Sequence, residues 1–239
     1  RQARAYTRYR RDYSGALYDA IGEVAGTGGG RRALDLGCGT GFVTASLGAR
    51  GWSVAGADFS RPMLAEARAF LGRSAPLLRS RAEALALRDG SVALVTCGTA
   101  FHWFTPRPTL EEITRVLAPG GTVALFWRYP APQAPTPKLI REVLRRFGCD
   151  IPDRQVFVHP HEPFRASALA PAPPRILRNV LRYTPAEFHG YAATTEFLRR
   201  FAGEHHAAFL DALRDELERR FPDGIEEPSE EHLFLARRP

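Results

Sequence analysis

Three glycines at alternate positions could hold a ligand. Gly37, Gly39 and Gly41 follow the short run Ala33–Leu36, in which Asp35 is the only charged residue. Glycine has no Cβ, so such a loop can turn sharply and let its backbone approach a bound molecule. A helix that begins directly after the loop would add free N–H groups for a polar or anionic group. The pattern indicates a ligand-binding loop, with a plain tight turn as the alternative.

A second acidic residue, Asp58, is spaced to cooperate with this loop. It follows the next predicted strand, about 20 residues beyond the glycines, where a carboxylate can accept hydrogen bonds from both ribose hydroxyls of a nucleoside. Alternatively Asp58 caps the following helix, but Ser60 already suits that role. Together, the glycines and Asp58 favour a ligand that contains a nucleoside.

A nicotinamide-dependent oxidoreductase shares these features and is the first competing hypothesis. Its fingerprint is G-x-G-x-x-G, but Phe42 stands where the third glycine is required, and Gly41 comes one place too early. Asp35 also lies inside the predicted strand, where dehydrogenases usually carry apolar residues. Both departures weaken the dehydrogenase hypothesis.

The segment Gly98–Phe104 follows another predicted strand and contains the best candidate for proton transfer. An imidazole near its unperturbed pKa accepts a proton at neutral pH, so His102 could act as a general base. Trp103 and Phe104 would offer a flat apolar wall to a substrate. A structural role for His102 is the alternative that the sequence leaves open.

Alternating strand and helix signals surround these residues. This alternation implies right-handed crossovers and a mostly parallel, doubly wound sheet, in which ligands bind beyond the carboxyl ends of the strands. Strands are expected at 33–36, 52–57, 77–78, 92–97 and 123–127, and helices at 13–25, 42–49, 61–71 and 110–117. After residue 128 we expect an irregular region, helices at 185–200 and 204–221, and a last strand at 232–236.

The composition argues against two kinds of partner. The 239 residues carry a formal net charge of +7, nearly all of it arginine because Lys138 is the only lysine. The arginines are scattered, so we expect a solvated surface rather than a nucleic-acid interface, with a local cluster only at residues 4–11. No apolar run reaches the roughly 20 residues that span a bilayer.

The cysteines and the ends of the chain bear on its location. Cys38, Cys97 and Cys149 lack paired spacing and fit a reducing compartment. No secretory signal is visible, although the chain begins at Arg1 rather than methionine. We therefore expect a cytoplasmic protein, either a monomer or a homodimer.

Five blocks of sequence occur in the order found in one known family. They are Leu34–Gly41, Ala57–Ser60 with Met63-Leu64, Ala82–Leu85 with Asp89–Ser91, Ala100–Phe104, and Arg115–Gly121. On these blocks the sequence resembles the class I S-adenosylmethionine-dependent methyltransferases, specifically the type 11 group with trans-aconitate methyltransferase-like and quinone-methylating enzymes. The resemblance covers residues 31–128. It implies S-adenosylmethionine as cofactor, S-adenosylhomocysteine as its product and a small-molecule methyl acceptor.

The resemblance also implies roles for individual residues. Asp35 and the backbone of the glycine loop would hold the methionine end, Asp58 the ribose and Glu83 the adenine amino group. For Phe59 and Met63, packing in the core is the alternative to contact with the adenine. The implied cofactor-binding residues are Arg10, Tyr13, Asp35, Gly37, Cys38, Gly39, Asp58, Phe59, Met63, Ala82, Glu83 and Cys97.

Arg10 and Tyr13 belong to a segment, Tyr9–Tyr13, that is similar to a lid over the cofactor in related enzymes. Family members usually carry prolines where this chain has Arg11 and Ser14. The alternative is a basic, partly disordered arm.

Methyl transfer requires the chain mainly to place the acceptor and remove its proton, because the cofactor supplies the electrophile. We expect His102 as the catalytic residue, and His102, Trp103 and Phe164 as acceptor-binding residues. No Asn/Asp-Pro-Pro-Tyr-type motif follows the fourth predicted strand, which favours a small acceptor over a nucleic-acid amino group. The acceptor atom (O, N, S or C) stays open, and we expect a role in secondary metabolism.

No metal is expected at the histidine pairs. His159 and His161 lie among prolines, and His205 and His206 diverge on a predicted helix, without an acidic trio near either pair. Two other functions remain as alternatives to methyl transfer: a methyltransferase-fold cyclase or decarboxylase, and a cofactor-binding protein without catalysis.

The predicted fold is α/β: a Rossmann-like, doubly wound, seven-stranded, mostly parallel sheet with an N-terminal helical lid. We predict one methyltransferase domain over residues 1–239. Within it we assign 1–25 to the lid, 31–128 to the cofactor-binding core, 129–200 to a substrate-side insertion, and 201–239 to a return helix and last strand.

Overall fold

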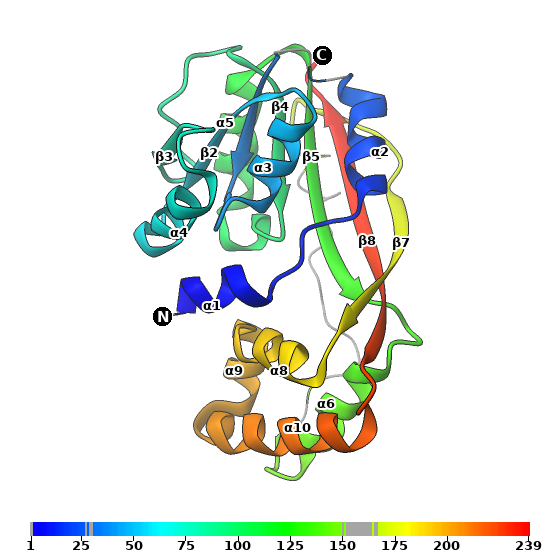
Figure 1. Ribbon diagram of the computed structural model, residues 1–239. Coiled ribbons are helices and arrows are strands. Elements are labelled where there is room, and N and C mark those ends of the chain that lie inside the picture. Colours follow the sequence, from blue (N-terminus) through cyan, green and yellow to red (C-terminus); the bar gives the residue numbers. More distant parts are fainter. Residues whose placement is uncertain (1, 27, 29–30, 150, 152–163, 165–166) are drawn as a thin grey trace. The chain divides into compact units, whose positions relative to one another are not determined.

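The computed structural model describes residues 2–26, 28, 31–149, 151, 164 and 167–239 (Figure 1). Its contacts divide the chain into two compact units. We call one the sheet unit; it comprises Asp12–Arg128, Val158–Leu177 and Glu231–Pro239. The other, the helical unit, comprises Arg1–Arg11, Tyr129–Phe157 and Arg178–Glu230. The predicted division into one domain with a lid and an insertion stays a prediction.

A central sheet with the strand order β3-β2-β1-β4-β5-β8-β6 dominates the fold, and β7 pairs with β8. The pairs β1–β2, β1–β4, β2–β3 and β4–β5 are parallel, whereas β6 and β8 are antiparallel. The doubly wound, mostly parallel α/β fold is therefore confirmed. The strands are β1 (Arg32–Leu36), β2 (Ser53–Asp58), β3 (Leu77–Arg79), β4 (Val92–Gly98), β5 (Leu117–Pro130), β6 (Ala170–Pro171), β7 (Arg175–Tyr183) and β8 (Ile225–Arg237).

The predicted number of strands was wrong. Within the described residues the sheet has eight strands rather than seven. The short β6 and the longer β7 come from a stretch that we expected to be irregular, and β8 begins seven residues before the expected start at His232. The first part of β8 escaped detection because its buried positions include Glu227, Ser229 and Glu231 instead of apolar residues.

The sequence Pro119-Gly120-Gly121 predicts a turn that ends the 110–117 helix, but these residues lie inside a strand. β5 begins at Leu117, and its pairing with β4 jumps from Leu117 opposite Val92 to Thr122 opposite Leu94. The residues between them, including the predicted Pro119–Gly121 turn, therefore form a bulge rather than a break between helix and strand.

The helices of the sheet unit are α2 (Gly15–Ala25), α3 (Phe42–Ala49), α4 (Arg61–Leu71) and α5 (Pro106–Val116), together with a 3-10 turn at Phe101–Trp103. Side-chain caps define two of their starts: Ser14 Oγ accepts from Leu17 N–H, and Ser60 Oγ accepts from Met63 N–H. α5 starts four residues earlier than expected, because Pro106 suits the first turn of a helix. The core of the sheet unit includes Leu17, Ile21, Leu47, Leu94, Phe126, Leu233 and Leu235.

The helical unit contains α1 (Gln2–Tyr9), α6 (Pro135–Arg145), α8 (Pro185–Ala193), α9 (Glu196–Ala202) and α10 (His206–Arg220). We expected the helix at 204–221 to return the chain to the sheet. α10 leads into β8, which is part of the sheet. The helix itself packs against α6 and α8, since Phe209, Leu213 and Leu217 on its buried face share a core with their apolar residues. No helix that the structure describes is long and apolar enough to cross a membrane.

Candidate functional site

The glycine loop joins β1 to α3 in a conformation that requires glycine. Gly37, Gly39 and Gly41 have φ angles of 71°, 53° and 93°, which L-residues with side chains rarely adopt. A Cβ on Gly37 would lie 2.5 Å from the Cβ of Ala100, whereas one on Gly39 would meet no atom within 4 Å. The loop is therefore pressed against the segment after β4 at one glycine and open at the next.

Asp35 lies beneath this loop and is 1% exposed. Thr44 Oγ1 donates to Asp35 Oδ2 at 2.7 Å, and Thr96 Oγ1 donates to Asp35 Oδ1 at 3.2 Å. Burial raises the pKa of this carboxyl to about 6. The observed contacts tie β1 to α3 and β4, so Asp35 supports the loop from below; its contact with the methionine end stays a prediction.

Asp58 lies at the end of β2, next to the glycine loop. Its Oδ2 accepts from Gly39 N–H at 2.9 Å and its Oδ1 accepts from Ser60 N–H at 2.7 Å. The loop is fixed to the same strand end, because Gly37 N–H donates to the Ala57 carbonyl oxygen at 2.8 Å. The structure thus brings the glycines and Asp58 together, as expected for neighbouring parallel strands.

Phe59 presents an exposed ring beyond β2. The residue is 58% exposed, so the alternative of core packing does not hold for it. The guanidinium groups of Arg79 and Arg81 lie 5.0 Å and 6.0 Å from the ring centroid. Met63, on α4, is half-buried. A flat base can therefore reach Phe59, while Met63 keeps both predicted roles.

Ala82 and Glu83 follow β3. Ala82 is buried, whereas Glu83 is half-buried and holds the first residues of α5. Glu83 Oε1 accepts from Thr105 N–H at 2.9 Å, and Glu83 Oε2 lies 3.5 Å from Arg81 Nε. The hydrogen bond from Thr105 N–H lowers the pKa of Glu83. The carboxylate stays ionised and keeps free lone pairs for an amino group.

Tyr13 and Thr99 form a pair at the end of β4. Tyr13 is among the predicted site residues, whereas Thr99 is not. The Tyr13 hydroxyl lies 2.6 Å from Thr99 Oγ1, and its ring meets Phe126 edge-on at 4.7 Å between centroids. Thr99 comes directly after β4 and has a φ of 48°, among the described residues the one positive φ outside glycine. Only its place at a strand end could have drawn attention to Thr99 in the sequence.

His102 and Trp103 belong to the 3-10 turn after β4. Trp127 Nε1–H donates to His102 Nδ1 at 3.2 Å, and Trp103 is 67% exposed. Partial burial of the imidazole lowers the pKa of His102 below its usual value, which favours the neutral form. Because Nδ1 accepts a hydrogen bond, the proton of the neutral ring is on Nε2. In this state His102 can donate from Nε2 but has no free lone pair there.

Other predicted site residues lie further from solvent or in the other unit. Phe164 and Cys97 are 0% exposed and Cys38 is 7% exposed, so these three side chains offer little surface to a ligand in this structure. Burial raises the pKa of both thiols. Arg10 lies in the helical unit, where its guanidinium donates to Thr194 and lies 4.5 Å from the Tyr191 ring centroid.

The absence of a metal at the histidine pairs stays a prediction. No group of three or more His, Cys, Asp or Glu residues in the part of the chain that the structure covers could hold a metal ion. His159 and His161 lie outside the described residues.

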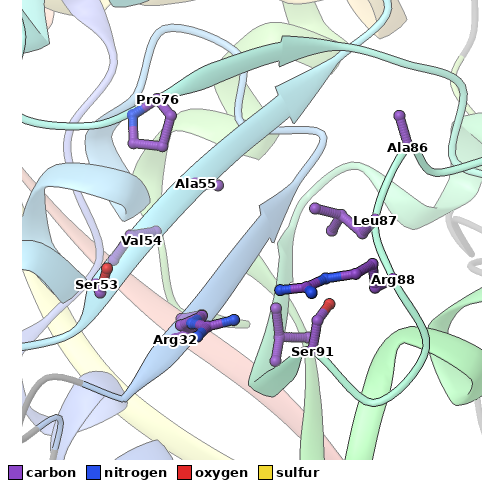
Figure 2. Close-up of a pocket in the computed structure, with 11 residues that line it drawn as sticks. Arg32, Ser53, Val54, Ala55, Pro76, Ala86, Leu87, Arg88 and Ser91 are labelled. Atoms are coloured by element: carbon purple, nitrogen blue, oxygen red, sulfur yellow. The ribbon is translucent and has the colours of Figure 1, made fainter.

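A hollow of about 290 Å³ lies at the amino ends of the strands, whereas the glycine loop follows a carboxyl end (Figure 2). Its lining includes Arg32, Ser53 and Val92, the first residues of β1, β2 and β4, together with Arg88 and Ser91. The glycine loop, Asp58 and Thr99 follow the carboxyl ends of these same strands. The hollow in Figure 2 is therefore separate from the candidate site.

Comparison with known proteins points to one family. Residues 34–125 match the model of a methyltransferase domain. An uncharacterized methyltransferase of Mycobacterium tuberculosis is 35% identical over 156 residues, which are 65% of this chain and 62% of the relative. A demethylmenaquinone methyltransferase of Thermus thermophilus is 39% identical over 109 residues, 43% of this chain and 50% of the relative. The chain thus spans less than two thirds of the length of these relatives.

Solved structures agree with this result at the level of the fold. A proposed type II methyltransferase from Anaeromyxobacter dehalogenans superposes with a TM-score of 0.74 at 23% identity, over 96% of this chain and 98% of that one. Residues 34–125 are thus similar to a methyltransferase domain, and the chain shares the fold of solved methyltransferases.

Proposed function

We propose that this chain transfers a methyl group from S-adenosylmethionine to a small-molecule acceptor. The observation that carries the proposal is the contact between Asp58 Oδ2 and Gly39 N–H at the carboxyl ends of β2 and β1. It places a carboxylate beside a glycine loop and a helix N-terminus, the arrangement that binds nucleosides in doubly wound sheets.

The residues at these strand ends fit the cofactor. Each Asp58 oxygen accepts one hydrogen bond and keeps a lone pair for a ribose hydroxyl. The space above Gly39 is open, and the exposed Phe59 ring can stack on the adenine. When bound, S-adenosylmethionine supplies the methyl group as an electrophile, so the protein contributes mainly position.

His102 suits the role of a hydrogen-bond donor better than that of a base. Its Nδ1 accepts from Trp127, so its Nε2 carries the proton and can orient an acceptor oxygen or nitrogen. To act as a base through Nε2, His102 would need its proton on Nδ1. That N–H group would then face the N–H group of Trp127. Proximity would then provide most of the rate enhancement.

The exposed Trp103 supports an acceptor with a flat or apolar part. Its ring lies 5.0 Å from the His102 ring, centroid to centroid, so an acceptor that stacks on Trp103 would come near the imidazole. One relative is named for demethylmenaquinone, a molecule with a flat ring, which is consistent with this class of acceptor.

A turnover assay tests the proposal. The purified chain is incubated with S-adenosylmethionine and a panel of phenols, quinols, amines, thiols and carboxylates, and release of S-adenosylhomocysteine is measured. We expect release with at least one flat acceptor and no reduction of NAD in a parallel reaction. Consumption of a substrate without release of S-adenosylhomocysteine would instead indicate the cyclase or decarboxylase alternative, and turnover of NAD would indicate the oxidoreductase.

A further inference from the structure

A buried ion pair in the sheet unit lies under the segment that carries Tyr13. Arg128 Nη2 is 2.6 Å and Arg128 Nε 3.1 Å from Glu231 Oε1. The Glu231 side chain is 0% exposed and the Arg128 side chain 14% exposed. A buried ion pair repays its desolvation only where further hydrogen bonds satisfy both groups, so its other partners indicate what it holds.

Two of its further partners, Asp12 and Ser14, belong to the link between α1 and α2. Ser14 donates to Glu231 through its backbone N–H at 3.0 Å and its hydroxyl at 2.5 Å. Arg128 Nη2 donates to the Asp12 carbonyl oxygen at 2.5 Å. The residues on both sides of Tyr13 are therefore fixed to the same ion pair.

The side chain of Asp12 adds a second anchor. Its Oδ1 accepts from the Tyr18 hydroxyl at 2.6 Å, and its Oδ2 accepts from the Ser46 hydroxyl. These contacts attach the link to α2 and α3. The backbone of residues 12–14 thus has few ways to move.

Tyr13 itself occupies a slot at the ends of β4 and β5. The Arg128 guanidinium lies 4.7 Å from the Tyr13 ring centroid, and Phe126 meets the ring from its edge. A Cβ on Gly98 would lie 2.7 Å from Phe126 and 3.2 Å from Tyr13, so glycine keeps the slot open. The slot directs the Tyr13 hydroxyl to Thr99.

Thr99 adopts a strained backbone conformation in this arrangement. A β-branched residue with a φ of 48° is strained, and such strain persists only where its surroundings hold it. Here Thr99 N–H donates to the Phe126 carbonyl oxygen at 2.8 Å, and its hydroxyl meets Tyr13. Because β4 is next to β1, Thr99 is at the same sheet edge as the glycine loop.

We propose that the Arg128–Glu231 ion pair is a positioning device that holds Tyr13 on Thr99 and thereby shapes the cofactor site. It acts through the backbone of residues 12–14, without touching the cofactor. The inference rests on the proposed function, because it assumes that this sheet edge binds S-adenosylmethionine.

The test compares two carboxylates of β8 by calorimetric titration with S-adenosylhomocysteine. Glu231→Gln keeps the shape of the side chain but removes the charge that holds Arg128, so we expect binding to weaken roughly 10- to 100-fold. Glu227→Gln is the matched control, since Glu227 is also buried on β8 but contacts Thr136 in the helical unit. We expect its affinity to equal that of the wild type.

A double-mutant cycle separates positioning from general destabilisation. If Glu231 acts through Tyr13, Glu231→Gln should add little to the loss caused by Tyr13→Phe, whereas it should add fully to Asp58→Ala. Arg128→Lys is the milder variant should Glu231→Gln fail to fold. A lysine cannot bind Glu231 and Asp12 and also stack on Tyr13, so we expect weaker binding than in the wild type. Because it keeps the positive charge, the loss of affinity should be smaller than that of Glu231→Gln.

The outcomes distinguish the two proposals. Wild-type affinity in folded Glu231→Gln or Arg128→Lys, or losses that add fully to that of Tyr13→Phe, would overturn the positioning role and leave the methyltransferase proposal intact. A folded wild-type chain that binds no S-adenosylhomocysteine would overturn both.

Discussion

The carboxylates at the ends of β1 and β2 and those along β8 are held in different ways. Asp35 and Asp58 accept hydrogen bonds from threonine hydroxyls and backbone amides. Glu231 accepts from the backbone amide and hydroxyl of Ser14 as well, but it also forms an ion pair with the guanidinium of Arg128. The first arrangement leaves lone pairs of Asp58 available at the sheet edge, whereas the second uses both oxygens of Glu231 to fix a neighbouring segment. In our proposals the first region receives the cofactor and the second holds the chain that borders it.

The largest expected effect on stability comes from a substitution in the glycine loop. Gly37→Ala should lower the free energy of unfolding by about 3 kcal/mol, because it combines a positive φ with a clash against Ala100. Gly39→Ala is the control, since it has a positive φ but open space, and should cost about 1 kcal/mol. Urea denaturation of both variants measures the difference. Equal losses would show that the loop is not pressed against the segment after β4.

The β8 carboxylates differ among themselves, and pH should reveal this. Burial raises the pKa of Glu227 to about 7 from its usual 4.5, so the folded state binds its proton more tightly than the unfolded state. Its contribution to stability is therefore full below pH 4.5 and is lost as the pH rises through 7. Glu227→Gln should raise the free energy of unfolding at pH 8 by about 2 kcal/mol and have little effect at pH 4.5.

The exposed neighbour Glu226 provides the control for this prediction. It pairs with Arg182 at 2.9 Å on the surface, and Glu226→Gln should change stability by less than about 1 kcal/mol at either pH. Urea denaturation at pH 4.5 and pH 8 measures both variants. A Glu227→Gln variant that is less stable than the wild type at pH 8 would contradict the account of a buried, uncompensated carboxylate.

A smaller effect is expected at the acceptor side of the sheet edge. His102→Ala should lower turnover by about 5- to 10-fold, the value of one hydrogen bond, if Nε2 only donates to the acceptor. Loss of a general base would cost roughly 100-fold or more. Trp127→Phe is the informative companion, because it frees His102 Nδ1 and lets the ring adopt the other tautomer. A 100-fold loss in His102→Ala with an unchanged cofactor affinity would restore His102 as the base.

The sequence predicted the glycine loop and the place of Asp58 beside it because the signals for both are local. Strand β1, the glycine loop and α3 follow one another within a few residues. The chain order also implies that β2, with Asp58 at its end, lies beside β1. These contacts depend on spacing and on the topology of parallel sheets, both of which a single sequence carries.

The remainder depends on contacts that no local pattern encodes. Arg128 and Glu231 are 103 residues apart, and Tyr13 and Thr99 are 86 apart. β7 also escaped prediction, because arginines alternate with the exposed Ile176 and Val180 on one of its faces. Arg128 and Glu231 are charged residues at buried positions, where the pattern of a strand requires apolar ones, and only their pairing explains them. In β7 the exposed apolar residues obscure the alternation instead.

The most direct test of the central claim is calorimetric titration of the wild type and of Asp58→Ala with S-adenosylhomocysteine. We expect binding in the micromolar range for the wild type and a loss of about 2 kcal/mol, roughly 30-fold in affinity, for Asp58→Ala. Equal affinity in the two folded proteins, or no binding by the wild type, would contradict a nucleoside site at the ends of β1 and β2.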